Sequence, residues 1–93
     1  MVIWQASAQA DITEILNFIA ADNPVAAARI VRKLREAGDS LSMFPGRGRV
    51  GQQAGTRELT VVRPYTLVYE LEPTGNVTIL RVWHAAQSRR PNA

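Results

Sequence analysis

The spacing of apolar residues predicts two amphipathic helices in the first half of the chain. Within residues 8–21 apolar side chains recur at i, i+3, i+4 and i+7, the period of one helix face. These positions are Ile12, Ile15, Leu16 and Ile19. A second pattern covers residues 24–41 and follows Asn23 and Pro24, a capping residue and a proline suited to the first helical position. The short connection between the two patterns predicts a helical hairpin.

Strand-like runs flank this hairpin on both sides. Residues 2–5 hold a short apolar, partly β-branched run, and we expect Ser7 after it to cap the first helix. Residues 57–83 contain three β-rich runs separated by two turn signals, which predicts an antiparallel meander. The turn signals are Arg63-Pro64 and Glu72-Pro73-Thr74-Gly75-Asn76. The order β-α-α-β-β-β predicts a two-layer α+β fold, in which the hairpin packs on an antiparallel sheet.

A basic, glycine-rich segment at residues 46–55 has no periodicity and is expected to be a mobile loop. Part of it, residues 46–51, matches the G-x-G-x-x-G pattern of dinucleotide sites. That site needs a strand before the glycines and a helix after them, whereas this segment follows a helix and leads into a strand. The pattern therefore predicts a flexible loop whose Arg47 and Arg49 can meet phosphate. Residues 84–93 form a C-terminal tail.

The length and composition exclude several classes of protein. A chain of 93 residues suffices for one domain with a modest core, so residues 1–93 are expected to be a single domain. There is no cysteine and His84 is the only histidine, so we expect no disulfide, metal or cofactor. No run approaches the about 18 apolar residues of a membrane span. We expect a cytoplasmic protein without a membrane partner.

Charge is divided unevenly between the two halves. Residues 1–45 carry four Arg or Lys and five Asp or Glu, whereas residues 46–93 carry seven Arg and three Glu, a net charge of +4. A basic surface attracts either phosphate backbones or an acidic protein chain, and the sequence does not separate the two, nor exclude a solvated basic face without a partner. The candidate residues for binding such a target, whether phosphate or protein, are Arg47, Arg49, Arg57, Arg63, Arg89 and Arg90.

Three residues of the predicted sheet are candidates for catalysis. His84 could act as a general acid or base, and Arg57 and Arg81 could bind phosphate and stabilise negative charge. If Arg57, Arg63 and Arg81 share one face of successive strands, they form a basic band. The simpler alternative is that His84 hydrogen-bonds a nearby turn and carries no chemistry.

Taken together and in order, these residues resemble the toxins of the RelE/ParE superfamily of bacterial type II toxin-antitoxin systems, the ParE branch in particular. The resemblance covers nearly the whole chain. It rests on Trp4 with Ser7, Ala10-Asp11-Ile12, Ile15, Ile19-Ala20, Asn23-Pro24, Ala26-Ala27-Ala28-Arg29, Phe44-Pro45-Gly46-Arg47, Gly51, Gly55-Thr56-Arg57-Glu58-Leu59, Pro64-Tyr65, Leu67-Val68-Tyr69 and Ile79-Leu80-Arg81-Val82-Trp83-His84-Ala85-Ala86-Gln87.

The resemblance implies a partner and two alternative activities. The partner is a cognate, usually acidic, ParD-like antitoxin that wraps the hairpin and sheet, and its expected contacts are Ile3, Trp4, Arg32 and Arg35. RelE-like toxins cleave mRNA on ribosomes with a set of basic residues and a tyrosine near the C terminus. ParE-like toxins inhibit DNA gyrase and serve in plasmid stabilization.

Two departures from the nuclease pattern favour the gyrase inhibitor. Thr66 stands where the nucleases carry an arginine, and no tyrosine follows Tyr69. The leading hypothesis is therefore a non-enzymatic, ParE-like inhibitor of DNA gyrase, with direct nucleic-acid contact left open. A RelE-like mRNA endonuclease using Arg57, Arg81 and His84 is the alternative. A third is an inactive toxin fold that serves as a binding module.

Overall fold

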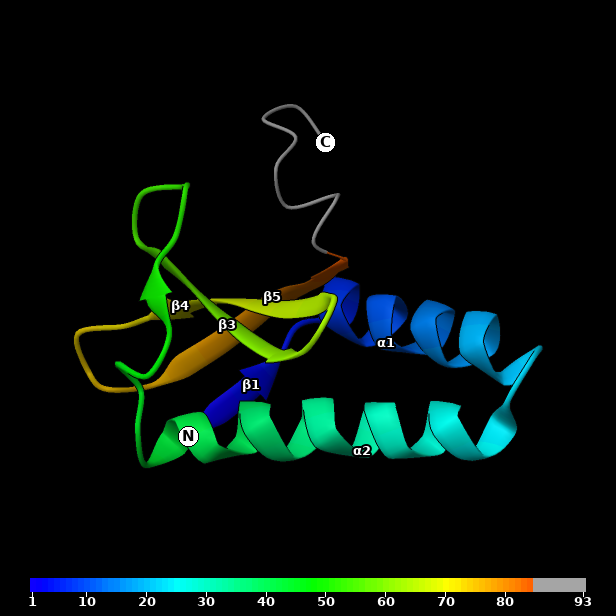
Figure 1. Cartoon of the computed structure of the whole chain (residues 1–93). Helices are drawn as coiled ribbons and strands as arrows, with labels where there is room; N and C mark the ends of the chain where they lie inside the picture. Colours follow the sequence, from blue (N-terminus) through cyan, green and yellow to red (C-terminus); the bar gives the residue numbers. More distant parts are fainter. Residues whose placement is uncertain (85–93) are drawn as a thin grey trace.

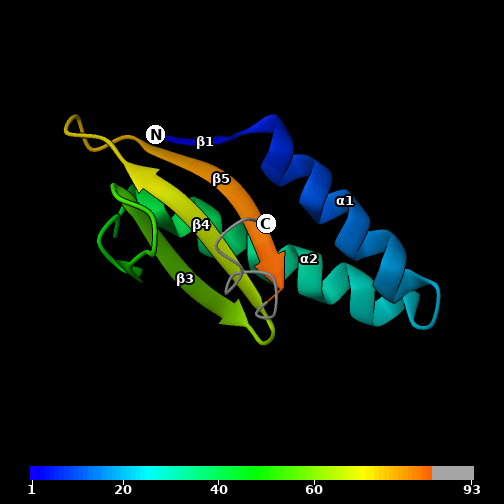
Figure 2. The same ribbon diagram turned by 90° about the horizontal axis from the view of Figure 1, so that it is seen from above.

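A computed structural model describes residues 1–84 as two helices packed on one face of a five-stranded sheet (Figure 1). In chain order the elements are β1 (Val2–Trp4), α1 (Ala6–Ala20), α2 (Pro24–Asp39), a 3-10 turn η1 (Ser40–Ser42), β2 (Arg49–Val50), β3 (Thr56–Val62), β4 (Tyr65–Leu71) and β5 (Val77–His84). Seen from above, α2 crosses beneath the sheet while α1 lies beside β5 (Figure 2). The predicted two-layer α+β fold is confirmed.

The sheet is mixed, which corrects the expected antiparallel sheet. Its strand order is β1-β5-β4-β3-β2, and β3, β4 and β5 form the predicted antiparallel meander. The first strand, however, runs parallel to β5, with Val2 opposite Val77 and Trp4 opposite Ile79. The segment between β1 and β5 contains both helices and strands β2–β4, and its length makes the parallel arrangement accessible, because parallel neighbours need a crossover rather than a tight turn.

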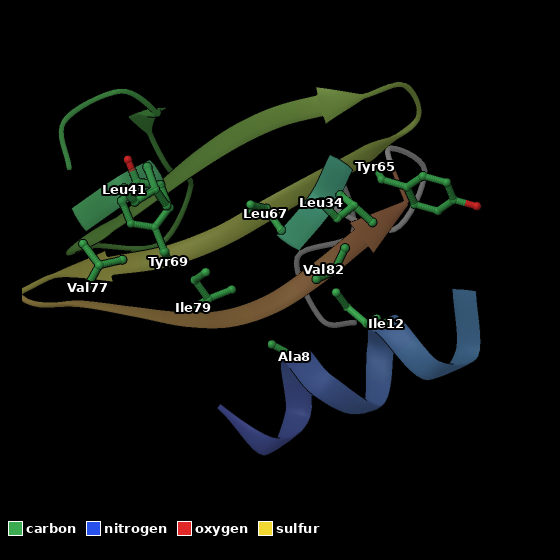
Figure 3. Packing of buried hydrophobic residues seen from close by; sticks show 10 residues of the cluster. All are labelled: Ala8, Ile12, Leu34, Leu41, Tyr65, Leu67, Tyr69, Val77, Ile79 and Val82. Atoms are coloured by element: carbon green, nitrogen blue, oxygen red, sulfur yellow. The ribbon is translucent and has the colours of Figure 1, made fainter. Parts of the chain in front are cut away.

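The core lies between the helices and the sheet (Figure 3). Its fully buried members from the helical layer are Ala8, Ile12, Leu34 and Leu41, and those from the sheet include Leu67, Tyr69, Val77 and Ile79. Gly38 belongs to this packing, because a Cβ there would collide with Cζ2 of Trp4 and lie 2.8 Å from Cδ1 of Ile79. The glycine that weakens the helix by propensity thus lets β1 approach α2 closely.

Two local expectations about the helix starts have different outcomes. Asn23 caps α2 as expected, since its side-chain oxygen accepts a hydrogen bond from the Ala26 amide at 3.0 Å. The expected role of Ser7 is wrong: α1 already begins at Ala6, and the Ser7 hydroxyl donates to the Leu80 carbonyl at 2.7 Å. A serine hydroxyl can hydrogen-bond the backbone at a helix end or at a strand edge, and in the folded chain Ser7 bonds the edge of β5.

The expected loop at residues 46–55 contains a short edge strand. Arg49 and Val50 pair with Glu58 and Arg57 of β3. Two residues are too few for a recognisable alternation of apolar and polar positions, so this strand has no signal in the sequence. Residues 1–84 contain no helix with both the length and the apolar character needed to cross a bilayer.

Candidate functional site

Arg81 is locked to α1 through Asp11. The Arg81 guanidinium donates to both Asp11 carboxylate oxygens, from Nε at 2.7 Å and from one terminal nitrogen at 3.1 Å. The same carboxylate accepts a hydrogen bond from the Val82 amide at 2.9 Å, and Asp11 is only 8% exposed. The hydrogen bond with Asp11 raises the pKa of Arg81 above its ordinary value. This arginine is therefore held as a cation and compensated within the fold.

These contacts belong to a row of hydrogen bonds from Gln5, Ser7 and Asp11 to the outer edge of β5. Where β1 ends, the Gln5 amide donates to the Ile79 carbonyl at 2.9 Å, and Ser7 and Asp11 then bond the backbone of Leu80 and Val82. The start of α1 thus replaces a neighbouring strand and satisfies backbone groups that would otherwise form an open edge. Sequence reasoning missed this role of Asp11, because nothing local distinguishes it from any acidic residue early in a helix.

Arg57 is also occupied by the fold, but by neutral groups. One of its terminal nitrogens donates to the Gly48 carbonyl at 2.7 Å and to the Gly46 carbonyl at 3.4 Å. Next to it the buried Tyr69 hydroxyl donates to the Pro45 carbonyl at 2.7 Å and accepts from the Gly48 amide at 2.9 Å. The glycine-rich segment that was expected to be mobile is therefore fastened to the sheet at several points.

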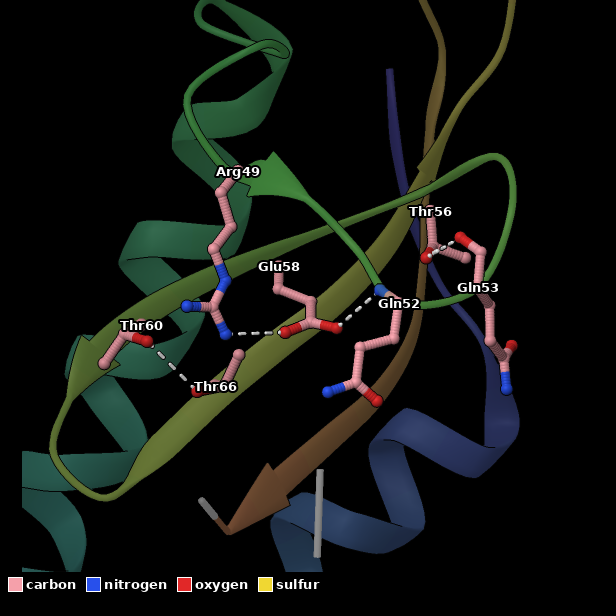
Figure 4. Close-up of polar contacts among 7 residues, drawn as sticks. All are labelled: Arg49, Gln52, Gln53, Thr56, Glu58, Thr60 and Thr66. Carbon is pink, nitrogen blue, oxygen red and sulfur yellow. Dashed lines mark hydrogen bonds and ion pairs between the residues drawn. The ribbon is translucent and has the colours of Figure 1, made fainter. Parts of the chain in front are cut away.

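The second half of the same loop is fastened by a buried carboxylate (Figure 4). Glu58 accepts a hydrogen bond from Arg49 at 2.9 Å and another from the Gln52 amide at 3.2 Å. Its side chain is almost wholly buried, whereas that of Arg49 is largely exposed. Further along, Thr66 contacts the Thr60 hydroxyl at 3.2 Å. The sequence position where a nuclease would carry an arginine is thus part of a threonine pair.

The predicted basic band on one sheet face is wrong. Arg57 pairs with Tyr69 and Arg81 pairs with Val68. Because successive residues of β4 point to opposite faces, this register assigns the two arginines to opposite faces as well. Arg63 lies apart from both, at the turn between β3 and β4. A bulge between Ile79 and Arg81 shifts the register of β5, and such a shift cannot be read from alternation in one strand.

His84 and Arg81 do share one small hollow at the end of β5. This hollow, of about 190 Å³, is also lined by Asp11, Glu14 and Tyr65. The His84 ring meets the Tyr65 ring edge to face, with 5.7 Å between centroids. Of the three candidate catalytic residues the structure therefore brings two together, and Arg57 is not among the residues that line the hollow. Across residues 1–84 no cluster of three His, Asp or Glu side chains could hold a metal ion.

The four expected antitoxin contacts fall into different surroundings. Trp4 donates from Nε1 to Asp39 at 3.1 Å, and the Arg35 guanidinium lies 5.7 Å from the Trp4 ring centroid, so these two form one cluster. Ile3 is about half exposed on β1. Arg32 instead lines a groove of about 420 Å³ near the start of α2, whose other lining residues are Pro24, Val25, Ala28 and Arg29.

The candidate target contacts are likewise spread out. Arg47 and Arg49 are exposed on the fastened loop and Arg63 is exposed at the β3–β4 turn. Arg89 and Arg90 lie outside the described residues.

Comparisons with known proteins match this architecture. Residues 2–89 match the family described as the ParE toxin of type II toxin-antitoxin system, parDE. "Toxin RelE2" of Caulobacter vibrioides is 43% identical over 86 residues, covering 92% of this chain and 96% of the relative. "Putative toxin Y4kP" of Sinorhizobium fredii is 39% identical, covering 90% and 86%.

A solved structure shares the fold. A chain of the chromosomal ParDE toxin-antitoxin system from P. aeruginosa superposes with a TM-score of 0.76 at 25% identity, covering 89% of this chain and 92% of that chain. Together with the family match over residues 2–89, this confirms the resemblance stated from the sequence. The chain belongs to the ParE toxin family of type II toxin-antitoxin systems.

Proposed function

We propose that this toxin acts by inhibiting DNA gyrase rather than by cleaving mRNA. The observation that carries the proposal is the engagement of both candidate phosphate-binding arginines by the protein itself. Arg57 bonds loop carbonyls and Arg81 bonds Asp11, and the strand register assigns them to opposite faces. A nuclease needs several cationic groups converging on one phosphate. Because gyrase works in the cytoplasm, the proposal also places the toxin there.

The hollow at the end of β5 favours the nuclease alternative, so the two activities have to be separated by experiment. The hollow that holds Arg81 and His84 combines a cation with a group able to transfer a proton. Inducing the toxin in cells separates the two activities. Gyrase inhibition predicts relaxed plasmid DNA and double-strand breaks with intact mRNA, whereas cleavage on ribosomes predicts cut mRNA and normally supercoiled plasmid. An absence of toxicity without antitoxin would instead support an inactive binding fold.

For the cognate antitoxin we propose the groove at the start of α2 as a contact surface. Val25 is 81% exposed there, and Arg29 and Arg32 flank it without any ion pair to a carboxylate among residues 1–84. Apolar surface beside uncompensated cations fits an acidic segment that also carries apolar side chains. Trp4 and Arg35 lie toward the other end of α2, where Trp4 bonds Asp39, so with Ile3 they would form a second antitoxin contact rather than part of the groove.

A charge reversal tests the antitoxin surface. Arg29→Glu with Arg32→Glu should weaken the complex by about 10-fold or more at low salt, with a smaller effect at high salt. Arg63→Glu makes a similar charge change at the β3–β4 turn and should leave antitoxin affinity nearly unchanged. Equal losses for the groove pair and for Arg63→Glu would show that general charge, rather than this groove, governs binding.

A further inference from the structure

A second exposed apolar surface lies beyond the other end of α2. Met43 is 77% exposed, Phe44 61% and Val50 76%. Seven large apolar residues are exposed in the described part of the chain, and three of them fall within residues 43–50, here called the 43–50 platform. Single exposed apolar residues are ordinary, whereas Met43 and Phe44 are adjacent and Phe44 lines a hollow, which makes this segment a candidate interaction site.

The backbone beneath these side chains is held in place. Phe44 and Arg47 belong to a closed turn, in which the Phe44 amide donates to the Ser40 carbonyl and the Arg47 amide to the Phe44 carbonyl, both at 3.1 Å. Tyr69 and Arg57 fix the following carbonyls at Pro45 and Gly48. A surface that is already ordered loses little conformational entropy when a partner binds, which favours affinity.

The charge of the platform indicates the kind of partner. A hollow of about 590 Å³ is lined by Ser40, Phe44, Gly46 and Arg47. The Arg47 guanidinium donates to the Ser40 hydroxyl at 3.0 Å and has no ion pair with a carboxylate of residues 1–84, whereas Arg49 is compensated by Glu58. The surface thus offers an aromatic and a thioether side chain beside one uncompensated cation.

We propose that the 43–50 platform docks the toxin on its protein target, through an apolar side chain of the target that enters the hollow beside a carboxylate that pairs with Arg47. This inference rests on the proposed function, in which the target is a protein. Phe, Met and Arg are typical of interface centres, and one free cation suits a single carboxylate better than a phosphate backbone.

The platform is separate from the proposed antitoxin groove. The two lie at opposite ends of α2, and a helix of its 16 residues is about 24 Å long. The groove carries two uncompensated arginines and the platform one, so the more acidic partner fits the groove. Two partners can therefore be assigned to two surfaces.

The test measures the inhibition of DNA gyrase and the binding of the antitoxin separately, both with purified full-length toxin. Met43→Ala with Phe44→Ala should raise the toxin concentration for half-maximal inhibition of DNA gyrase by about 30-fold or more, the size expected for an interface centre. The same variant should keep its antitoxin affinity within about 3-fold and its melting temperature nearly unchanged, because both side chains are exposed. Val25→Ala gives the reciprocal comparison: it removes an 81% exposed apolar side chain at the antitoxin groove, so it should weaken antitoxin binding while leaving the inhibition of gyrase within about 3-fold.

Measuring growth arrest after induction separates a failure of the platform proposal from a failure of the gyrase proposal. If the wild-type toxin arrests growth without affecting gyrase, the gyrase proposal fails and the platform is judged by growth arrest alone. Full toxicity of the Met43→Ala, Phe44→Ala variant would overturn the platform. A loss of toxicity no larger than that of Val25→Ala, or a loss of antitoxin binding in place of toxicity, would overturn it as well. An Arg47→Glu variant that loses salt-sensitive oligonucleotide binding together with toxicity would overturn it in favour of nucleic acid.

Discussion

Arg57 and Arg81 lie on the two strands that flank β4, yet they are held in different ways. Arg57 donates to backbone carbonyls of a loop, which are neutral, whereas Arg81 forms a bidentate ion pair with a buried carboxylate of α1. The first contact fastens a surface segment and the second fastens a helix to a strand edge. An arginine expected to bind an external phosphate can therefore be a structural residue, and the group that it bonds determines how much of its charge remains at the surface.

The largest expected effect concerns the partner of Arg81. Asp11→Ala removes the acceptor of the Val82 amide as well as the ion pair, so we expect the free energy of unfolding to fall by about 2–3 kcal/mol. The estimate stays below that of a wholly buried pair because the Arg81 side chain is 46% exposed and can be hydrated. Urea denaturation measures the change.

Two further substitutions control this measurement. Asp11→Asn keeps an oxygen for the Val82 amide and should cost less than Asp11→Ala. Asp22→Ala removes an exposed carboxylate at the hairpin turn and should change stability by less than about 0.5 kcal/mol. If Asp11→Ala lowered the free energy of unfolding no more than Asp22→Ala does, the contacts of Asp11 with β5 would contribute little to stability.

The next effect concerns the loop that Arg57 holds. Tyr69→Phe removes a buried hydroxyl that bridges Pro45 and Gly48, which should lower the free energy of unfolding by about 1–2 kcal/mol. Hydrogen exchange of the Gly48 amide should also accelerate, because that amide loses its acceptor. Unchanged exchange at Gly48 would mean that the loop is held by other contacts.

A functional comparison of the two arginines follows. Arg57→Ala should lower the free energy of unfolding by about 1 kcal/mol, because it breaks hydrogen bonds to neutral carbonyls at a partly exposed site. Arg81→Ala should lower it by about 2 kcal/mol, because the nearly buried Asp11 carboxylate is left without its cation. Toxicity should persist in both variants at a temperature where they remain folded. A nuclease that uses these groups in its transition state would lose about 100-fold or more in activity. Loss of toxicity in both folded variants would contradict the gyrase proposal.

The smallest effect is the response of the two contacts to salt. The Asp11–Arg81 coupling free energy, measured by a double-mutant cycle, should fall by about 0.3 kcal/mol between about 0.05 M and 1 M NaCl. The cost of Arg57→Ala should change less, because its acceptors are neutral carbonyls. Equal salt responses would erase the distinction between the two arginines.

Local patterns in the sequence predicted most of the fold. The i, i+3, i+4 spacing identified α1, the Asn23-Pro24 pair identified the start of α2, and the turn signals around Pro64 and Gly75 separated the strands of the meander. Each of these signals acts over a few residues, so each can be read without knowledge of the tertiary structure.

The site could be predicted only in part, because its decisive contacts join residues far apart in the sequence. Arg81 and Asp11 are separated by 70 positions, and the bulge that shifts β5 against β4 has no local signature. The parallel pairing of β1 with β5 was missed for the same reason, whereas the edge strand β2 was missed because its two residues are too few to show an alternation. The basic charge of the second half was evident, but which arginines remain uncompensated depends on the fold.

Inhibition of gyrase by this toxin can be measured with purified toxin, DNA gyrase and supercoiled plasmid. The cognate antitoxin is added in a parallel reaction, and the Met43→Ala, Phe44→Ala variant serves as the matched toxin control. We expect inhibited supercoiling or trapped linear DNA with the wild-type toxin, and we expect the antitoxin to relieve either effect. Undiminished gyrase activity at toxin concentrations that fully bind antitoxin would contradict the gyrase proposal and would favour mRNA cleavage on ribosomes.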